Sequence, residues 1–148
     1  MANAGRLANV GANASADNVA TLCSSGWLTI FAGTQPTLAD TASSSGGAAN
    51  VLLARLKLAA TAFGAASSGY ALAGAITDDS AAANTGTATW FRVYEFDATT
   101  TIGPTGGTAV FDGSVGTASA NLIMNTVAIS SGATVSCSSF TYQQQKST

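Results

Sequence analysis

Residues 51–59 alternate between apolar and charged side chains with a period of two. The apolar set is Leu52, Ala54, Leu56 and Leu58, and the charged set is Arg55 and Lys57. Successive side chains of a β-strand point to opposite faces, so this pattern predicts a strand with one buried face. A helix would scatter the two sets around its axis. The chain is therefore expected to build its fold from β-sheets.

Residues 86–96 hold the densest group of strand-forming residues. They include Thr87, Thr89, Trp90, Phe91, Val93, Tyr94 and Phe96. β-branched and aromatic side chains favour the pleated surface of a sheet, so we expect the central strand of the fold here. Large residues occupy both faces of this strand. One face is therefore expected in the core, and the other under a loop or a partner.

Turn-forming residues divide the rest of the chain into short apolar runs. Further strands are predicted at residues 27–32, 70–77, 122–129 and 133–142, and a strand, tight turn and strand at Val110–Phe111, Asp112–Gly113 and Ser114–Val115. Residues 37–50 are expected to form a surface loop. About seven or eight short strands predict an all-β fold, an antiparallel β-sandwich or jelly roll with at most one short helix.

One domain accounts for all 148 residues, since domains usually contain about 100–200 residues. Residues 1–14 lack periodicity and are expected to form an N-terminal arm. Ser15 is a suitable N-cap for a short helix over residues 15–23, which leads the predicted β-sandwich domain of residues 15–142. Residues 143–148 are expected to form a polar tail. Neither end is expected to contribute much to the fold of the isolated domain.

Large apolar residues within the predicted strands form the expected core. They are Trp27, Ile30, Leu52, Leu56, Trp90, Phe91, Val110, Phe111, Leu122 and Val135. The candidates for contact with a partner are Arg6, Arg92, Tyr94 and Phe96. Arg92 is the one cation of the aromatic strand. It is expected either on the surface, with its stem over apolar neighbours, or in an ion pair with Asp112, Glu95 or a partner subunit.

Charged residues make up only 8% of the chain, against about 25% in a typical globular protein. More than half of the residues are Ala, Thr, Ser or Gly. Such a surface is desolvated at little cost, which favours a protein whose surface is largely covered in its final state. A net charge of −2, with five Lys and Arg in all, argues against nucleic-acid binding. The sequence has neither a membrane-spanning run nor a signal pattern, so synthesis in the cytoplasm is expected.

The sequence contains no histidine, which removes the most common general base. The adjacent pair Asp78–Asp79 is expected to serve as solvated turn residues, because a calcium site needs about six to eight oxygens. Glu95 and Asp97 make only a weak case for a glycosidase pair. Cys23 and Cys137 are expected to be buried small hydrophobes, with a disulfide formed after release as the alternative. No catalytic residue, metal site or cofactor is predicted, and we expect no enzymatic activity.

Four segments carry recognisable motifs. Residues 27–36 contain L-x-I-(Y/F)-x-G-x-Q-P, and residues 86–93 begin with G-T-A-x-W-F-R. Residues 112–117 are D-G-x-V-G-T, and residues 132–140 are G-A-T-V-S-x-S-S-F. Over most of its length, from Arg6 to Tyr142, the chain resembles a family of small virion proteins of tailed bacteriophages. That family is similar to the jelly-roll cement proteins that clamp neighbouring capsomers on phage heads.

The resemblance implies a non-enzymatic structural protein of a phage virion, most directly a capsid decoration (cement) protein on the outer capsid surface. Its implied partners are the major capsid protein and further copies of the chain, in a homo-oligomer such as a dimer or trimer. Neither nucleic acid nor a membrane is expected as a partner. The alternatives are a tail or head–tail junction component, a receptor-binding module with an aromatic sugar platform, and a lytic enzyme.

Overall fold

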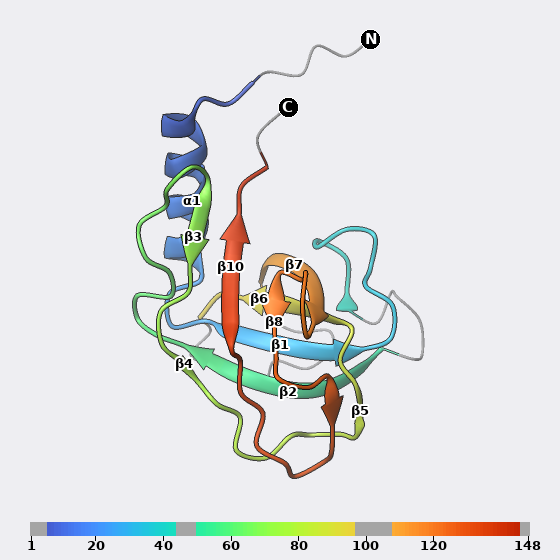
Figure 1. Ribbon diagram of the computed structural model, residues 1–148. Helices are drawn as coiled ribbons and strands as arrows, with labels where there is room; N and C mark the ends of the chain where they lie inside the picture. The colour runs from blue at the N-terminus through green and yellow to red at the C-terminus, as the bar shows by residue number, and fades with distance from the viewer. Residues whose placement is uncertain (1–5, 44–49, 97–107, 146–148) are drawn as a thin grey trace.

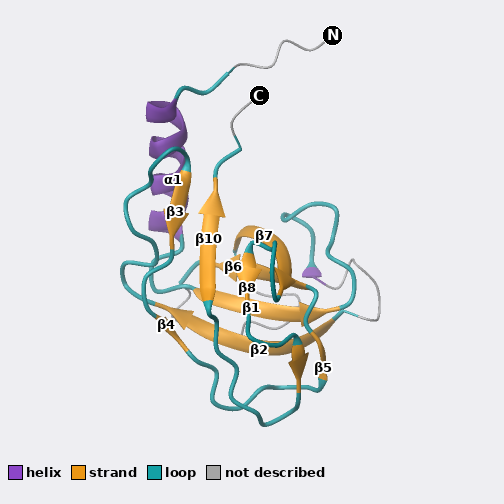
Figure 2. Cartoon of the chain, viewed as in Figure 1, coloured by secondary structure: helices purple, strands orange, loops and turns teal. Residues whose placement is uncertain are grey.

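The structure, a computed structural model, describes residues 6–43, 50–96 and 108–145. Its elements in chain order are α1 (Asn9–Leu22), β1 (Trp27–Ala32), β2 (Val51–Leu58), β3 (Tyr70–Leu72), β4 (Ile76–Thr77), β5 (Gly86–Thr87), β6 (Trp90–Tyr94), β7 (Ala109–Gly116), β8 (Leu122–Ile123), β9 (Ala128–Ile129) and β10 (Ser139–Gln143). The all-β prediction is confirmed: strands dominate the fold, and α1 stands at one side of them (Figures 1 and 2).

One curled sheet of eight strands forms the body, in the order β3-β10-β8-β7-β6-β1-β2-β4, and β5 and β9 form a separate pair. In Figure 1, β3 and β10 run across the direction of β1 and β2, so the sheet bends over itself in a sandwich-like arrangement. The predicted antiparallel pairing fails at one place. β7 and β8 pair in parallel, at Val115 with Leu122 and Gly116 with Ile123.

The concave side of this sheet encloses a single hydrophobic core. Phe91 lies at its centre, with ring centroids 5.0 Å from Phe140 and 5.8 Å from Phe111, both in edge-to-face geometry. Of the predicted core residues, five are buried in this cluster: Ile30, Leu56, Phe91, Leu122 and Val135. Val110 and Phe111 pack against it while partly exposed. Aromatic pairs of this geometry stabilise the fold beyond the area that they bury.

Leu52 was predicted in the core, and this prediction is wrong. The pairing of β1 with β2 shifts register between Ile30 and Phe31, which face Ala54 and Leu52. Leu53 is therefore an additional residue in β2, and it is buried beside Ala54. A one-residue bulge reverses which face each side chain occupies. Leu52 consequently lies half-buried on the other side of the sheet.

Asp112–Gly113 was predicted to be a tight turn, whereas both residues lie in the middle of the continuous strand β7. Gly113 pairs with Phe91 of β6. A Cβ atom on Gly113 would lie 2.9 Å from the Phe91 ring, closer than any side chain tolerates. The glycine is thus required by the close approach of an aromatic ring, not by a turn.

The helix begins at Asn9, within the segment predicted to be an arm. Its buried face consists of Ala12 and Ala16, and Ala8, before its first turn, provides no side-chain cap. The side chain of Asn13 accepts a hydrogen bond of 2.8 Å from the Gly69 backbone N–H, which holds the helix beside β3. A helix that packs through alanines lacks the apolar periodicity by which helices are predicted. At the other end of the chain, Gln143 belongs to β10 and not to the predicted tail.

Replacing Phe91 or Leu56 by Ala should lower the free energy of unfolding by about 2–5 kcal/mol, because each removal leaves a cavity in the core. The exposed Leu72 provides a control, since Leu72→Ala should change it by less than about 0.5 kcal/mol. Denaturant unfolding followed by circular dichroism measures all three variants. Equal losses for Phe91 and Leu72 would contradict this location of the core.

Replacing Asn13 by Ala should lower the free energy of unfolding by about 1–3 kcal/mol, because the Gly69 N–H loses its acceptor. Asn18 lies exposed on the same helix, and Asn18→Ala should be neutral or slightly stabilising because Ala favours helix. Thermal melting compares the two. If both variants melt like the wild type, the start of α1 contributes nothing to the fold.

Candidate binding site

The five residues of β6 are all buried, on two faces of the sheet. Phe91 and Val93 belong to the core cluster. Trp90, Arg92 and Tyr94 lie on the opposite side, which we call the second face of the sheet. Arg92 and Tyr94 were predicted to contact a partner, but each is almost completely buried within its own chain. The loop cover that the sequence predicted as one option accounts for the second face.

Arg92 forms the centre of the second face. Its guanidinium donates a hydrogen bond of 2.7 Å to Asp112 Oδ2, in an ion pair between β6 and β7. This is one of the partners that the sequence suggested. The guanidinium also donates to the backbone carbonyls of Thr41, at 2.5 Å, and Leu38, at 3.4 Å. It lies 5.4 Å from the centre of the Trp90 ring. The planar group thus binds a carboxylate and a loop backbone at the same time.

Residues 34–43, which we call the anchored loop, are held at further points. The Gln35 side chain donates a hydrogen bond of 2.8 Å to Asp112 Oδ1, so both carboxylate oxygens are occupied. Asn50 donates to the carbonyls of Thr34 and Ser43, both at 2.7 Å, and accepts from the Thr34 N–H at 2.6 Å. One asparagine therefore ties together the two ends of the loop. The sequence predicted an exposed loop here and gave no sign of these anchors, because they depend on contacts distant in sequence.

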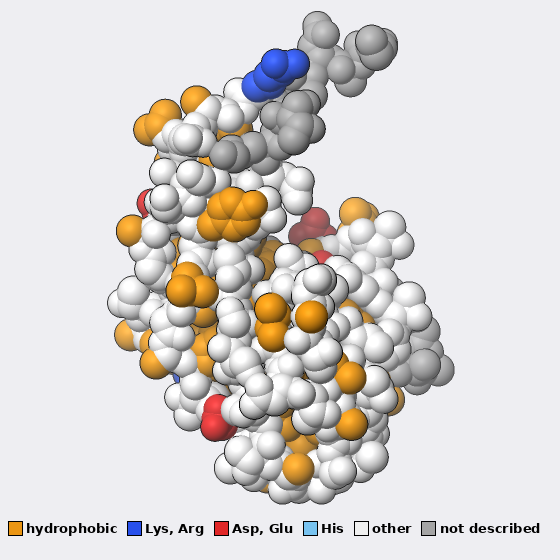
Figure 3. Space-filling view, viewed as in Figure 1, with side chains coloured by type: hydrophobic (Ala, Val, Ile, Leu, Met, Phe, Trp, Pro, Cys, Tyr) orange, Lys and Arg blue, Asp and Glu red, His pale blue; other side chains and the backbone are white. Residues whose placement is uncertain are grey.

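The anchored loop carries an exposed apolar side chain at its middle. Leu38 is 60% exposed although its carbonyl is bound by the buried Arg92. In Figure 1 the loop (cyan) projects from the body of the sheet, and hydrophobic atoms lie on the projecting end in Figure 3. The loop thus combines a fixed backbone with an exposed leucine.

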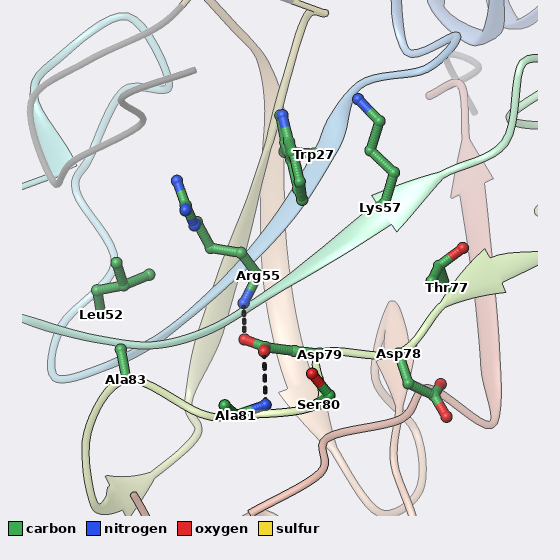
Figure 4. Close-up of a pocket in the computed structure, with 10 residues that line it drawn as sticks. All are labelled: Trp27, Leu52, Arg55, Lys57, Thr77, Asp78, Asp79, Ser80, Ala81 and Ala83. Atoms are coloured by element: carbon green, nitrogen blue, oxygen red, sulfur yellow. Dashed lines mark hydrogen bonds between the residues drawn. The ribbon is translucent and has the colours of Figure 1, made fainter. Parts of the chain in front are cut away.

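A second candidate is an open cavity of about 370 Å³ beside β2. Trp27, predicted in the core, instead lies half-buried at this cavity, with Arg55 and Lys57 on either side of it (Figure 4). The Lys57 Nζ atom is 4.4 Å from the centre of the indole ring, and the Arg55 guanidinium is 5.4 Å from it. Both distances are those of cation–π contacts. The indole is therefore occupied by its own chain and offers no free platform for a sugar.

Asp79 borders the same cavity, and its carboxylate serves the fold. Its oxygens accept hydrogen bonds from the backbone N–H groups of Arg55, at 2.8 Å, and Ala81, at 3.0 Å. The bond from Arg55 covers part of the outer edge of β2, where an unpaired N–H would otherwise invite another strand. Asp78 is exposed. Across the described ranges, no three His, Cys, Asp or Glu side chains gather in a way that could hold a metal ion.

The remaining candidate residues form no common site in the described part of the chain. Arg6 is exposed, just before α1. Phe96 is 56% exposed, and its ring lies 4.6 Å from Lys57 Nζ. Glu95 is half-buried, while Asp97, its partner in the weak glycosidase hypothesis, lies outside the described residues. The described residues therefore give no geometry for that pair.

Cys23 and Cys137 are both free thiols. Burial raises the pKa of Cys23 to about 12 and that of Cys137 to about 11. Thiolates are the reactive form of cysteine, so neither side chain is a nucleophile near neutral pH. In the part of the chain that the structure describes, no helix has the length and hydropathy needed to cross a membrane.

Comparisons with protein-family models, curated proteins and solved structures found no match to this chain. The contacts within the chain are therefore the basis for proposing a function.

Replacing Arg92 by Met should lower the free energy of unfolding by about 3–5 kcal/mol, because the buried Asp112 carboxylate is left without its cation. The double variant Arg92→Met with Asp112→Asn removes both charges while the amide can still accept from Gln35. Much of the loss should then be recovered. Denaturant unfolding measures both, and a double variant as unstable as the single one would contradict the coupling.

Proposed function

We propose that this chain is a non-enzymatic structural protein of a tailed-phage virion, most directly a capsid decoration protein that binds the major capsid shell. It acts on the outer capsid surface as a homo-oligomer, after synthesis in the bacterial cytoplasm. Its task is mechanical. A protein that binds only the assembled shell stabilises that shell by mass action.

The observation that carries this proposal is the meeting of three motif segments. β1, β6 and β7 are neighbours in the sheet, and each lies in or beside a segment that resembles the phage virion family. The polar residues Gln35, Arg92 and Asp112 come one from each segment, and Asp112 accepts hydrogen bonds from both of the others. The resemblance therefore rests on residues that the fold uses together. Motif residues scattered over the surface, without contacts between them, would support the resemblance less.

The surface chemistry agrees with a protein that is covered in its final state. Arg92, one of the few cations, is buried in an ion pair, and Lys57 donates to the Ser25 carbonyl between two aromatic rings. Hydroxyls, amides and small apolar groups remain to face a partner. Such groups are desolvated at little cost, which favours a broad contact with other proteins.

The hypothesis of a receptor-binding module with an aromatic sugar platform loses its support. Trp90 and Tyr94 are buried, and Trp90 stacks on Phe31 with ring centroids 4.3 Å apart. A receptor-binding role would therefore need another surface. A tail or head–tail junction role is distinguished from the shell role by stoichiometry.

The copy number of the chain in purified particles of the phage that encodes it tests the proposal. A shell protein should be present in a fixed ratio to the major capsid protein, on the order of hundreds of copies per particle, because it follows the symmetry of the shell. Quantitative mass spectrometry gives this ratio. About a dozen copies would indicate a tail or junction component, and absence from the particle would refute a virion role.

A further inference from the structure

We propose that the second face of the sheet contains a binding site for a small inorganic monoanion, of the size and charge of chloride, beside Thr29 and between Arg55 and Arg92. Hydrogen-bond donors that the fold buries without a partner hold the ion. This inference does not depend on the virion role, because it uses only residues within one chain.

The site lies in a row of side chains across four neighbouring strands. Thr29 of β1 is the register partner of Arg55 on β2 and of Arg92 on β6, and Arg92 is the partner of Asp112 on β7. Directly opposed residues of antiparallel strands share a face, with Cβ atoms about 4.5–5.5 Å apart. Thr29 is therefore flanked by two arginines. Two guanidiniums accompany one carboxylate in this row, so one bound monoanion brings the row to neutrality.

Buried polar atoms without a partner gather on the same face. Across the described residues, the buried side-chain nitrogen and oxygen atoms that lack a hydrogen-bond partner are Thr29 Oγ1, Arg92 Nε, Trp27 Nε1, Trp90 Nε1 and Ser43 Oγ. Four of them come from second-face positions of β1 and β6, and Ser43 ends the anchored loop that Arg92 binds. Thr29 and Arg92 are each only 1% exposed. An unsatisfied buried donor is destabilising, so this concentration on one face indicates a bound group.

The chemistry of these atoms favours an anion. Indole and guanidinium nitrogens can only donate a hydrogen bond, whereas the hydroxyls of Thr29 and Ser43 can donate or accept. A water molecule could accept from the donors, but its own two hydrogens would then need acceptors as well. A halide ion only accepts, and the positive charge of the arginines attracts it. The same donors and charge disfavour a metal cation.

One side of the site borders the open cavity beside β2. Arg55 lines that cavity together with Trp27, and its guanidinium lies 5.4 Å from the centre of the indole ring (Figure 4). Thr29 and Arg92 follow in the next two strands of the sheet. An ion can thus reach Arg55 from solvent. This arrangement favours an ion that exchanges with the solution over one that is trapped during folding.

The experiment compares Thr29→Val with Thr87→Val. Thr29→Val removes the hydroxyl without changing any charge, and Thr87→Val makes the same change at an exposed position of β5. Thermal melting is measured in sodium chloride and in sodium gluconate at equal ionic strength, so that screening is the same. With chloride tenfold above its dissociation constant, the wild type and Thr87→Val should melt about 3–6 °C higher than in gluconate. Thr29→Val should melt at the same temperature in both salts.

The other outcomes would overturn the site. No advantage of chloride for the wild type would mean that buried water alone serves these donors, and an equal advantage for Thr29→Val would place the ion elsewhere. Half of the wild-type effect should be reached below about 0.15 M chloride, the physiological ionic strength. An effect seen only at higher concentration would indicate an adventitious ion only.

A test on the wild-type chain decides the matter even if Thr29→Val does not fold. Crystals grown in bromide should show anomalous scattering beside Thr29 Oγ1, because bromide replaces chloride at such sites. Crystals without an anomalous peak at that place would contradict the proposal.

Discussion

A guanidinium and a carboxylate face each other between β6 and β7, with only 2% and 11% of their side-chain surfaces exposed. Neither charge would tolerate this burial alone, because an unpaired ion in a protein interior is strongly destabilising. Each also binds the anchored loop, through Leu38, Thr41 and Gln35. Two central strands and one loop are thus coupled through a single pair. A change that removes either side chain therefore also removes a contact of the loop.

The sheet can accommodate this ion pair because different kinds of side chain are buried on its two faces. On the core face, Phe91 packs against Phe111 and Phe140, and Gly113 leaves the room that the Phe91 ring needs. Apolar contact there supplies most of the stability. On the second face, Arg92 lies among aromatic rings and loop carbonyls, and its Nε atom has no hydrogen-bond partner.

Local patterns in the sequence predicted these strands well. The alternation of apolar and polar residues, and the density of aromatic residues, indicate which side chains a pleated sheet can bury. β1 spans the predicted residues 27–32, and β2 and β6 lie within their predicted segments. The failures have a common cause, which is that the deciding contact is distant in sequence. The bulge at Leu53, the strand conformation of Asp112–Gly113 and the early start of α1 depend respectively on β1, on Phe91 and on Gly69.

The candidate site was predictable only in part, because its contacts are also distant in sequence. The sequence predicted Asp112 as a possible partner of Arg92 because the two have opposite charges, although Asp112 was expected in a tight turn. It gave no reason to connect either residue with the loop, because Arg92 binds the loop mainly through backbone carbonyls, which every residue has. Leu38 likewise stands in no strand or helix pattern.

These contacts limit the ways in which such a chain can recognise anything. Of its few cations, Arg92 is paired and buried, and Lys57 lies between Trp27 and Phe96. The carboxylates of Asp79 and Asp112 are likewise occupied by hydrogen bonds within the chain. Four of the twelve charged side chains are thus engaged within the fold, and two of them, Arg92 and Asp112, also hold the anchored loop. A loop that is ordered before binding loses less entropy when a partner covers it.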